Sequence, residues 1–215
     1  MSSKTLARIL SAATFSMALV NCGTLRAAEP SFRIGDSAPV IAPVTWLKGT
    51  PVAQYDPGRV YVVEFWATWC PPCIRTIPHL SALQQQHAST LTIVGVNAEG
   101  LLGFEAKTSA VNSFMTKHGR DMAYTVAMED PIGKPISGTW IIGTGSLGAP
   151  TAGIIDQHGK LVWIGYPDVA KGYTFDQALE DTLAGKVDLG RSRALQIELS
   201  NETAKYWAAH AHKSS

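Results

Sequence analysis

The sequence predicts one α/β domain with a mixed sheet flanked by helices. Residues 60–66 form an apolar run rich in β-branched and aromatic side chains, and residues 91–97 form a second; both runs are typical of strands buried on two faces. Apolar residues recur at helical spacing across 74–86, so the two strands are expected to be parallel through a helical crossover. Residues 151–155 and 161–164 enclose a polar turn with glycine, which predicts an antiparallel hairpin.

The remaining elements follow from weaker patterns. Residues 31–58 are rich in Pro and Gly and contain short apolar pieces before a Lys-Gly-Thr turn, which predicts an N-terminal β-hairpin extending the sheet. Further helices are expected at 109–118, 134–142 and 175–183, and a short strand at 124–128.

Composition fits a globular domain with a sizeable core. The chain has 215 residues, of which 46% are hydrophobic and 16% charged, and its formal net charge is +1. This balance gives no sign of a nucleic-acid partner, and we expect a monomer.

Residues 1–28 are predicted to be an export signal. Lys4 and Arg8 precede an uncharged, mostly apolar run over 9–20, which is too short to span a bilayer but suits a secretory signal. Removal of this segment would give a periplasmic or otherwise extracytoplasmic protein. Lipidation at Cys22 and retention of the segment as an uncleaved anchor are the two alternatives.

After removal of the signal, Cys70 and Cys73 are the remaining cysteines. An isolated close pair in an oxidising compartment indicates a working dithiol. A zinc site would need two further ligands, and covalent haem attachment would need His where Ile74 stands. We therefore expect no metal and no cofactor beyond the redox-active disulfide.

The cysteines stand where the predicted helix begins. A helix N-terminus carries free N–H groups and about half a positive charge, so it favours the thiolate that acts as nucleophile. Cys70 is expected to be open to solvent and to attack a partner disulfide. Cys73, one turn into the helix and partly covered, would then resolve the mixed disulfide.

The segment 64–73, Glu-Phe-Trp-Ala-Thr-Trp-Cys-Pro-Pro-Cys, resembles the active-site segment of thioredoxins, and more closely that of exported TlpA/ResA-type proteins. Glu64 matches the buried acid six residues before the first cysteine, and Pro78 matches the helix proline eight residues after it. Gly148-Ala149-Pro150-Thr151 is similar to the cis-proline loop of the family. The resemblance implies a thioredoxin-like fold over 31–190, with 191–215 as a helical or flexible tail.

The resemblance also implies roles for single residues. Glu64 would be a buried carboxyl with a raised pKa that exchanges a proton with Cys73; alternatively it ends the strand and reaches water. Ala149 and Thr151 would flank a cis Pro150 and present backbone groups to an extended partner segment.

Three residues of the cysteine turn complete the predicted site. Trp69 is expected to shape the docking surface, or else to act as a shielding hydrophobe without a specific partner. Pro71 and Pro72 restrict the turn and remove two N–H donors.

These observations predict an exported thiol-disulfide oxidoreductase. The resemblance to TlpA/ResA-type proteins implies that it reduces disulfides of partner proteins, and such a reductant would be recharged by a membrane electron donor. A thiol peroxidase is one alternative, although Ala67 stands where peroxiredoxins carry a hydroxyl residue. A Cu(I)-binding metallochaperone module is the other.

Overall fold

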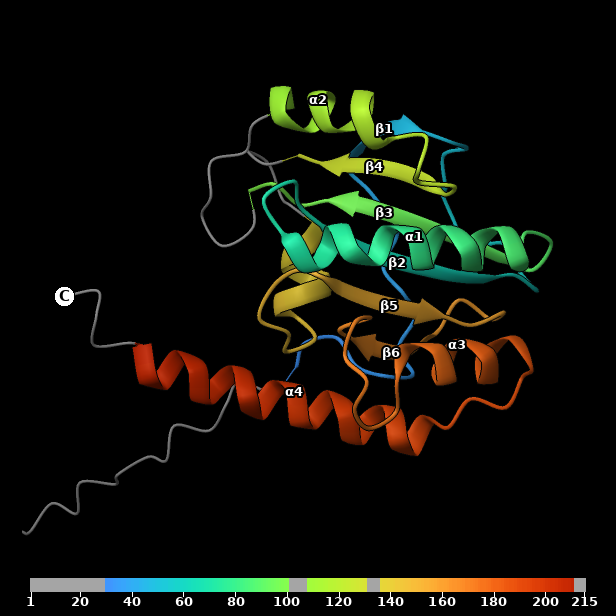
Figure 1. The fold of residues 1–215 in the computed structure, drawn as a ribbon. Helices are drawn as coiled ribbons and strands as arrows, with labels where there is room; N and C mark the ends of the chain where they lie inside the picture. Colours follow the sequence, from blue (N-terminus) through green and yellow to red (C-terminus); the bar gives the residue numbers. More distant parts are fainter. Residues whose placement is uncertain (1–29, 101–107, 131–135, 211–215) are drawn as a thin grey trace, which may run out of the picture.

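The computed structural model describes residues 30–100, 108–130 and 136–210, and a six-stranded mixed sheet lies at its centre (Figure 1). The strand order is β1-β4-β3-β2-β5-β6. The strands are β1 (Val44–Lys48), β2 (Val60–Trp66), β3 (Leu91–Asn97), β4 (Thr125–Glu129), β5 (Thr151–Ile155) and β6 (Leu161–Gly165).

The central strand β2 is buried along its whole length. It pairs in parallel with β3 and antiparallel with β5, and β5 pairs antiparallel with β6. The predicted crossover and hairpin are therefore confirmed. Because side chains alternate across a strand, Val62, Glu64 and Trp66 of β2 share one face of the sheet.

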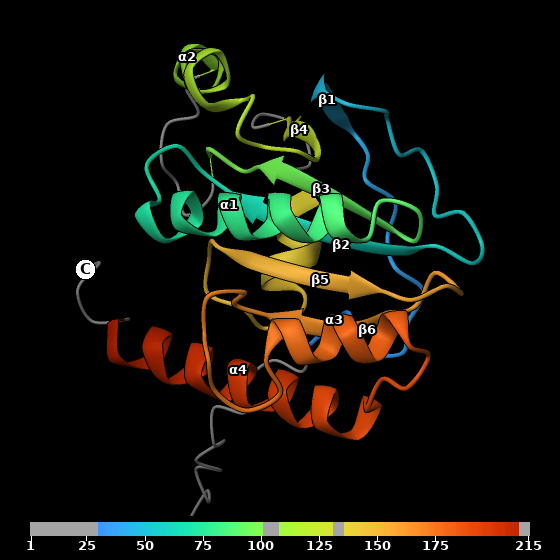
Figure 2. The same cartoon turned by 45° about the vertical axis from the view of Figure 1, so that its right-hand side comes forward.

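Helices cover both faces of this sheet (Figures 1 and 2). On one face, α1 (Pro71–Gln86) and α3 (Phe175–Leu183) bury Leu80 and Leu179 against an apolar cluster that includes Val62 and Trp66. On the other face, η2 (Gly138–Ile142), a single π-helical turn, packs Trp140 beneath Phe65. The helix α2 (Thr108–His118) packs Phe114 on Trp66, with ring centroids 5.0 Å apart.

The N-terminal extension joins the sheet at its edge. β1 pairs antiparallel with β4, a strand distant in sequence, so the described part of residues 31–58 adds one strand to the sheet. The chain after β1 contains Pro51 and Pro57, which have no N–H to donate to a local ladder. Lys48 Nζ also donates to the Gly119 and Met122 carbonyls, which fixes the end of β1 beside α2.

The long helix α4 (Leu189–His210) is attached to the domain by buried polar groups. Gln196 accepts a hydrogen bond from the Ile34 N–H at 3.0 Å and donates to the Phe32 carbonyl at 2.8 Å. Its amide also donates to the Thr144 carbonyl at 3.3 Å. Leu199 is buried as well, and Figure 2 shows the helix running along the β6 side of the sheet.

Some expectations fall outside the described residues. Residues 1–28, with the predicted export signal and Cys22, are among them, and so is the first part of the helix predicted at 134–142. Within the described ranges, no helix is both long and apolar enough to cross a bilayer.

Two glycines allow a stability test of how α4 is seated. Gly145 has φ +87°, and a Cβ there would lie 3.0 Å from Ser200 Cα of α4, whereas Gly159 has φ +73° with no atom within 4 Å of such a Cβ. Gly159→Ala should cost about 1 kcal/mol of unfolding free energy for the left-handed backbone alone. Gly145→Ala should cost about 2 kcal/mol more because Ser200 must move. Urea unfolding of both variants measures the difference, and equal losses would mean that α4 does not press on this loop.

Candidate active site

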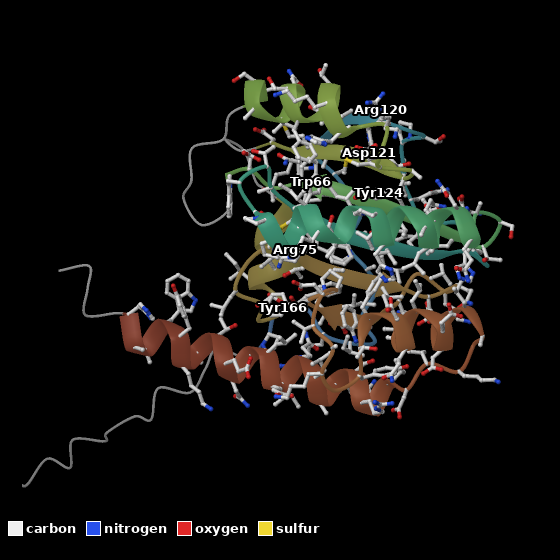
Figure 3. All side chains as sticks on the ribbon, viewed as in Figure 1. Trp66, Arg75, Arg120, Asp121, Tyr124 and Tyr166 are labelled. Atoms are coloured by element: carbon white, nitrogen blue, oxygen red, sulfur yellow. A yellow bond between two sulfur atoms is a disulfide. The ribbon has the colours of Figure 1, made fainter. Side chains whose placement is uncertain are left out.

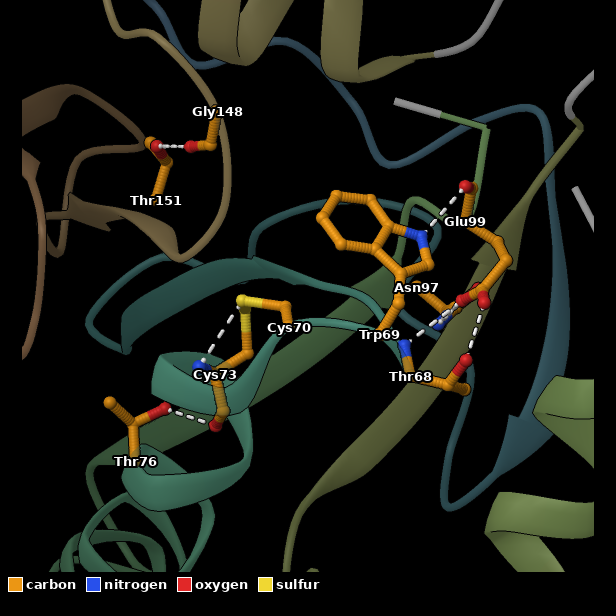
Figure 4. Close-up of a disulfide and its surroundings, with 9 residues drawn as sticks. All are labelled: Thr68, Trp69, Cys70, Cys73, Thr76, Asn97, Glu99, Gly148 and Thr151. Carbon is orange, nitrogen blue, oxygen red and sulfur yellow. Dashed lines mark hydrogen bonds between the residues drawn. A yellow bond between two sulfur atoms is a disulfide. The ribbon is translucent and has the colours of Figure 1, made fainter. Parts of the chain in front are cut away.

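Cys70 and Cys73 form a disulfide at the start of α1, with an S–S distance of 1.97 Å and Cα atoms 5.3 Å apart. Cys70 is the N-cap, and its Sγ accepts the Cys73 N–H at 3.3 Å (Figure 4). Pro71 and Pro72 occupy the first two helical positions, where a missing N–H costs nothing because it would have no helical partner. Cys73 therefore supplies the first N–H of the helix, and this N–H points at the Cys70 sulfur.

Both cysteines are more buried than the sequence suggests. Cys70 is 3% exposed and Cys73 0%, so the expected asymmetry is small and Cys70 is not open to solvent in this oxidised form. The reason is that both residues belong to the apolar cluster beneath α1, against which Ala149 packs. Only a narrow edge of Cys70 is left for an incoming thiolate.

Glu64 lies inside the sheet and does not reach water. It is 1% exposed, and it sits between Gly95 of β3 and Ala152 of β5. Burial raises the pKa of Glu64 to about 8. The strand alternation places it on the α1 face, the face on which the two cysteines pack. A carboxyl with this pKa can take up and release a proton near neutral pH.

Two other polar groups lie near Glu64 on the same face. The Tyr124 ring and the Trp66 indole pack directly on Gly95, which has no side chain. A Cβ at this position would lie only 2.9 Å from the Tyr124 ring and 3.3 Å from Trp66 Nε1. Burial raises the pKa of Tyr124, and the Glu64 charge raises it further. Within the described residues, Glu64 Oε1, Trp66 Nε1 and the Tyr124 hydroxyl have no hydrogen-bond partner; Figure 3 labels Trp66 and Tyr124.

A buried glutamate that the sequence reasoning missed holds the turn before Cys70. Glu99 accepts hydrogen bonds from the Thr68 N–H at 3.0 Å and from the Thr68 hydroxyl, and from Asn97 Nδ2 at 3.2 Å (Figure 4). Its backbone carbonyl accepts the Trp69 indole N–H at 3.2 Å. The Trp69 ring is thereby fixed at the edge of the disulfide.

The sequence did contain a signal for Glu99. Two polar residues, Asn97 and Glu99, follow directly after the apolar run of β3. Because β2 and β3 are parallel, their carboxyl ends meet at one edge of the sheet, which is the edge that carries Cys70. The sequence analysis gave Glu99 no role, because this juxtaposition depends on the pairing of β2 with β3.

The loop before β5 forms another wall of the site. The Ala149–Pro150 peptide bond is cis, as the resemblance implies. Thr151 donates its hydroxyl to the Gly148 carbonyl and pairs with Phe65 of β2. This pairing sets Pro150 beside the end of β2, close to the cysteine turn.

A cavity of about 610 Å³ lies between these walls and the end of α4. Its lining residues are Trp69, Leu147, Gly148, Ala149, Tyr166, Tyr206 and Trp207. A larger cavity of about 800 Å³ is lined by Arg59, Gln84 and Thr125, among others. It lies at the other end of β2, away from the disulfide. Among the described residues, no group of three or more His, Cys, Asp or Glu side chains is placed to hold a metal ion.

The buried Glu64 makes a specific prediction for stability against pH. Unfolded, its pKa is near 4.5; folded, it is about 8. Between these values the folded state holds a proton that the unfolded state has released, so the unfolding free energy falls as pH rises. Glu64→Gln should remove this dependence, which is on the order of a few kcal/mol across the window.

Urea unfolding of the oxidised protein at pH 5 and pH 8 measures the effect. Glu202→Gln is the matched control, because Glu202 is exposed in the folded protein and should leave the slope unchanged. The same slope in wild type and Glu64→Gln would contradict the raised pKa.

The chain is similar in sequence to known thiol-disulfide oxidoreductases. The chain is 33% identical to the thiol-disulfide oxidoreductase ResA of Bacillus cereus over 136 residues, which are 62% of this chain and 70% of that protein. It is 33% identical to a thiol:disulfide interchange protein DsbE homolog of Paracoccus denitrificans over 166 residues, 74% of this chain and 82% of that one.

A solved structure shows the same fold. The thioredoxin domain of a thiol-disulfide oxidoreductase from Bacteroides vulgatus superimposes with a TM-score of 0.52 at 21% identity, covering 73% of this chain and 99% of that domain. The family model described as Redoxin matches residues 33–181. With its helix-capped cysteine pair and its thiol-disulfide oxidoreductase relatives, the chain belongs to the Redoxin family.

Proposed function

We propose that this protein is an exported thiol-disulfide oxidoreductase that reduces disulfides in partner proteins through Cys70 and Cys73. The observation that carries the proposal is the Cys70–Cys73 disulfide at the first turn of α1. A sulfur held by a helix N–H at this position is stabilised as a thiolate when the disulfide opens.

In the reduced protein, the Cys70 thiolate attacks one sulfur of a partner disulfide. The partner's S–S bond breaks, the departing sulfur leaves as a thiolate and takes a proton from solvent, and a mixed disulfide joins Cys70 to the partner. Cys73 then loses its proton and attacks Cys70 Sγ. The mixed disulfide breaks, the partner leaves with two thiols, and the protein ends in the bridged form described above.

Glu64 is the proposed acceptor for the Cys73 proton. Its raised pKa and its position on the α1 face support this role. The burial of the two cysteines also supports different roles for them. Cys70 keeps a narrow exposed edge that can meet a partner, whereas Cys73 is fully buried and shielded from a second partner.

The proposed export rests on the sequence of residues 1–28. The proposed direction of electron transfer rests on the resemblance to TlpA/ResA-type proteins. The charged-then-apolar pattern of residues 1–28 supports export. Outside the cytoplasm a reductant must be recharged, so we propose a membrane-bound dithiol donor that returns two electrons to the Cys70–Cys73 disulfide.

The roles of the two cysteines can be separated by trapping. Cys73→Ser should accumulate mixed disulfides with partner proteins, because the attack that releases the partner is lost. Cys70→Ser should trap few or none, because Cys73 is buried. Non-reducing electrophoresis after alkylation of cells carrying each variant gives the comparison, and equal trapping by both would refute the assignment.

The direction of exchange follows from the reduction potential. Equilibration with dithiothreitol or glutathione, followed by alkylation and mass determination, should give a potential near or below about −250 mV for a reductant. A potential near about −120 mV would instead identify an oxidant and overturn the proposed direction.

A further inference from the structure

Two aromatic residues of α4 share a cavity with the residue next to Cys70, although they lie outside the part of the chain that the Redoxin family matches. Tyr206 and Trp207 line the 610 Å³ cavity together with Trp69, the neighbour of Cys70, and Ala149, the neighbour of Pro150. The family match ends at residue 181. The aromatic wall formed by Tyr206 and Trp207 therefore lies outside the segment that the family model matches.

The contacts of α4 with the loop before β5 place this wall. Ser200 lies against Gly145, and Thr203 donates its hydroxyl to the Gly145 carbonyl at 2.6 Å. Trp207 follows Thr203 by four residues and Ser200 by seven, so the three share one face of the helix. That face continues from Gly145 towards Leu147 and Ala149, and Tyr166 supports the same loop by accepting the Leu147 N–H at 3.1 Å.

The wall is exposed and uncharged. Trp69 is 36% exposed, Tyr206 44% and Trp207 55%. The described residues that line the cavity include no Asp, Glu, Lys, Arg or His. Tyr206 is held in place by His210, whose ring stacks on it with centroids 4.2 Å apart. Large aromatic side chains with one polar atom are the residues that most often anchor a binding partner.

We infer that this cavity binds the segment next to the reacting cysteine of the partner protein and selects an aromatic or long aliphatic side chain there. The inference rests on the proposed function, because a partner bonded to Cys70 Sγ must lay its neighbouring residues over Trp69 and Ala149. The cavity is large enough for one or two such side chains and offers no charge to pair with a polar one. Trp207 and Tyr206 form the α4 side of this cavity.

The test uses the full-length protein and two disulfide-linked peptide dimers that differ only in the residues flanking the cysteine, Phe in one and Ser in the other. With dithiothreitol as reductant, kcat/KM for the Phe peptide should exceed that for the Ser peptide by roughly tenfold. Trp207→Ala should bring this ratio close to one, and so should the double variant that also carries Tyr206→Ala. Ile197→Ala is the matched control, since Ile197 is a 61% exposed apolar residue of the same helix that does not line the cavity.

Each outcome is decisive. Loss of the ratio in Trp207→Ala with an unchanged ratio in Ile197→Ala supports the inference. A ratio near one in wild type, or a ratio that survives in Trp207→Ala, overturns it. An equal rise of kcat/KM for both peptides in Trp207→Ala would show that an inhibitory segment of the same chain occupies the cavity. A ratio that changes with protein concentration would show that a second copy of the chain occupies it. Either result overturns the inference. Wild-type protein that exchanges with neither the peptides nor glutathione disulfide would instead refute the proposed function.

Discussion

The pairing of β2 with its two neighbours is the constraint on which the site depends. β2 lies between β3 and β5, and it is buried along its whole length. Its carboxyl end leads into the cysteine turn, its parallel pairing with β3 brings Glu99 to the same edge, and its antiparallel pairing with β5 brings in Pro150. Three loops far apart in sequence therefore meet around one disulfide.

The same burial explains the unusual chemistry of Glu64. A carboxylic acid in a fully buried strand is costly to ionise unless its charge is paired, so Glu64 keeps its proton to a higher pH. The strand would be more stable with an apolar residue here. The proton acceptor that we propose here therefore comes at the expense of stability in neutral solution.

Residue patterns were sufficient for the parts of the fold that depend on local periodicity. The apolar run of β2, the helical spacing after Cys73 and the hairpin from Thr151 could all be read because each element buries a regular face. The pairing of β1 with β4 and the depth of Cys70 could not, because both depend on which distant segments cover them. Glu99 was missed for a similar reason, since its hydrogen bonds to Thr68 appear only when β2 and β3 are aligned.

The tail shows the limit of periodicity most clearly. The sequence predicts only a helical or flexible tail here, because the apolar residues Leu195, Leu199 and Trp207 lie loosely on one side. Besides the buried Leu199, polar contacts of Gln196, Ser200 and Thr203 attach α4 to the domain, and none of these three residues marks a core-facing helix in a hydrophobicity pattern.

The bond from Ile34 to Gln196 joins positions 162 residues apart. Contacts of such long range form late, because most of the intervening chain must already be in place. Because β6 is synthesised before α4, the flank of β6 that this helix covers stays uncovered until α4 has been made. α4 therefore completes the domain by covering β6, and interrupted synthesis leaves that flank of β6 available to unrelated strands or chaperones.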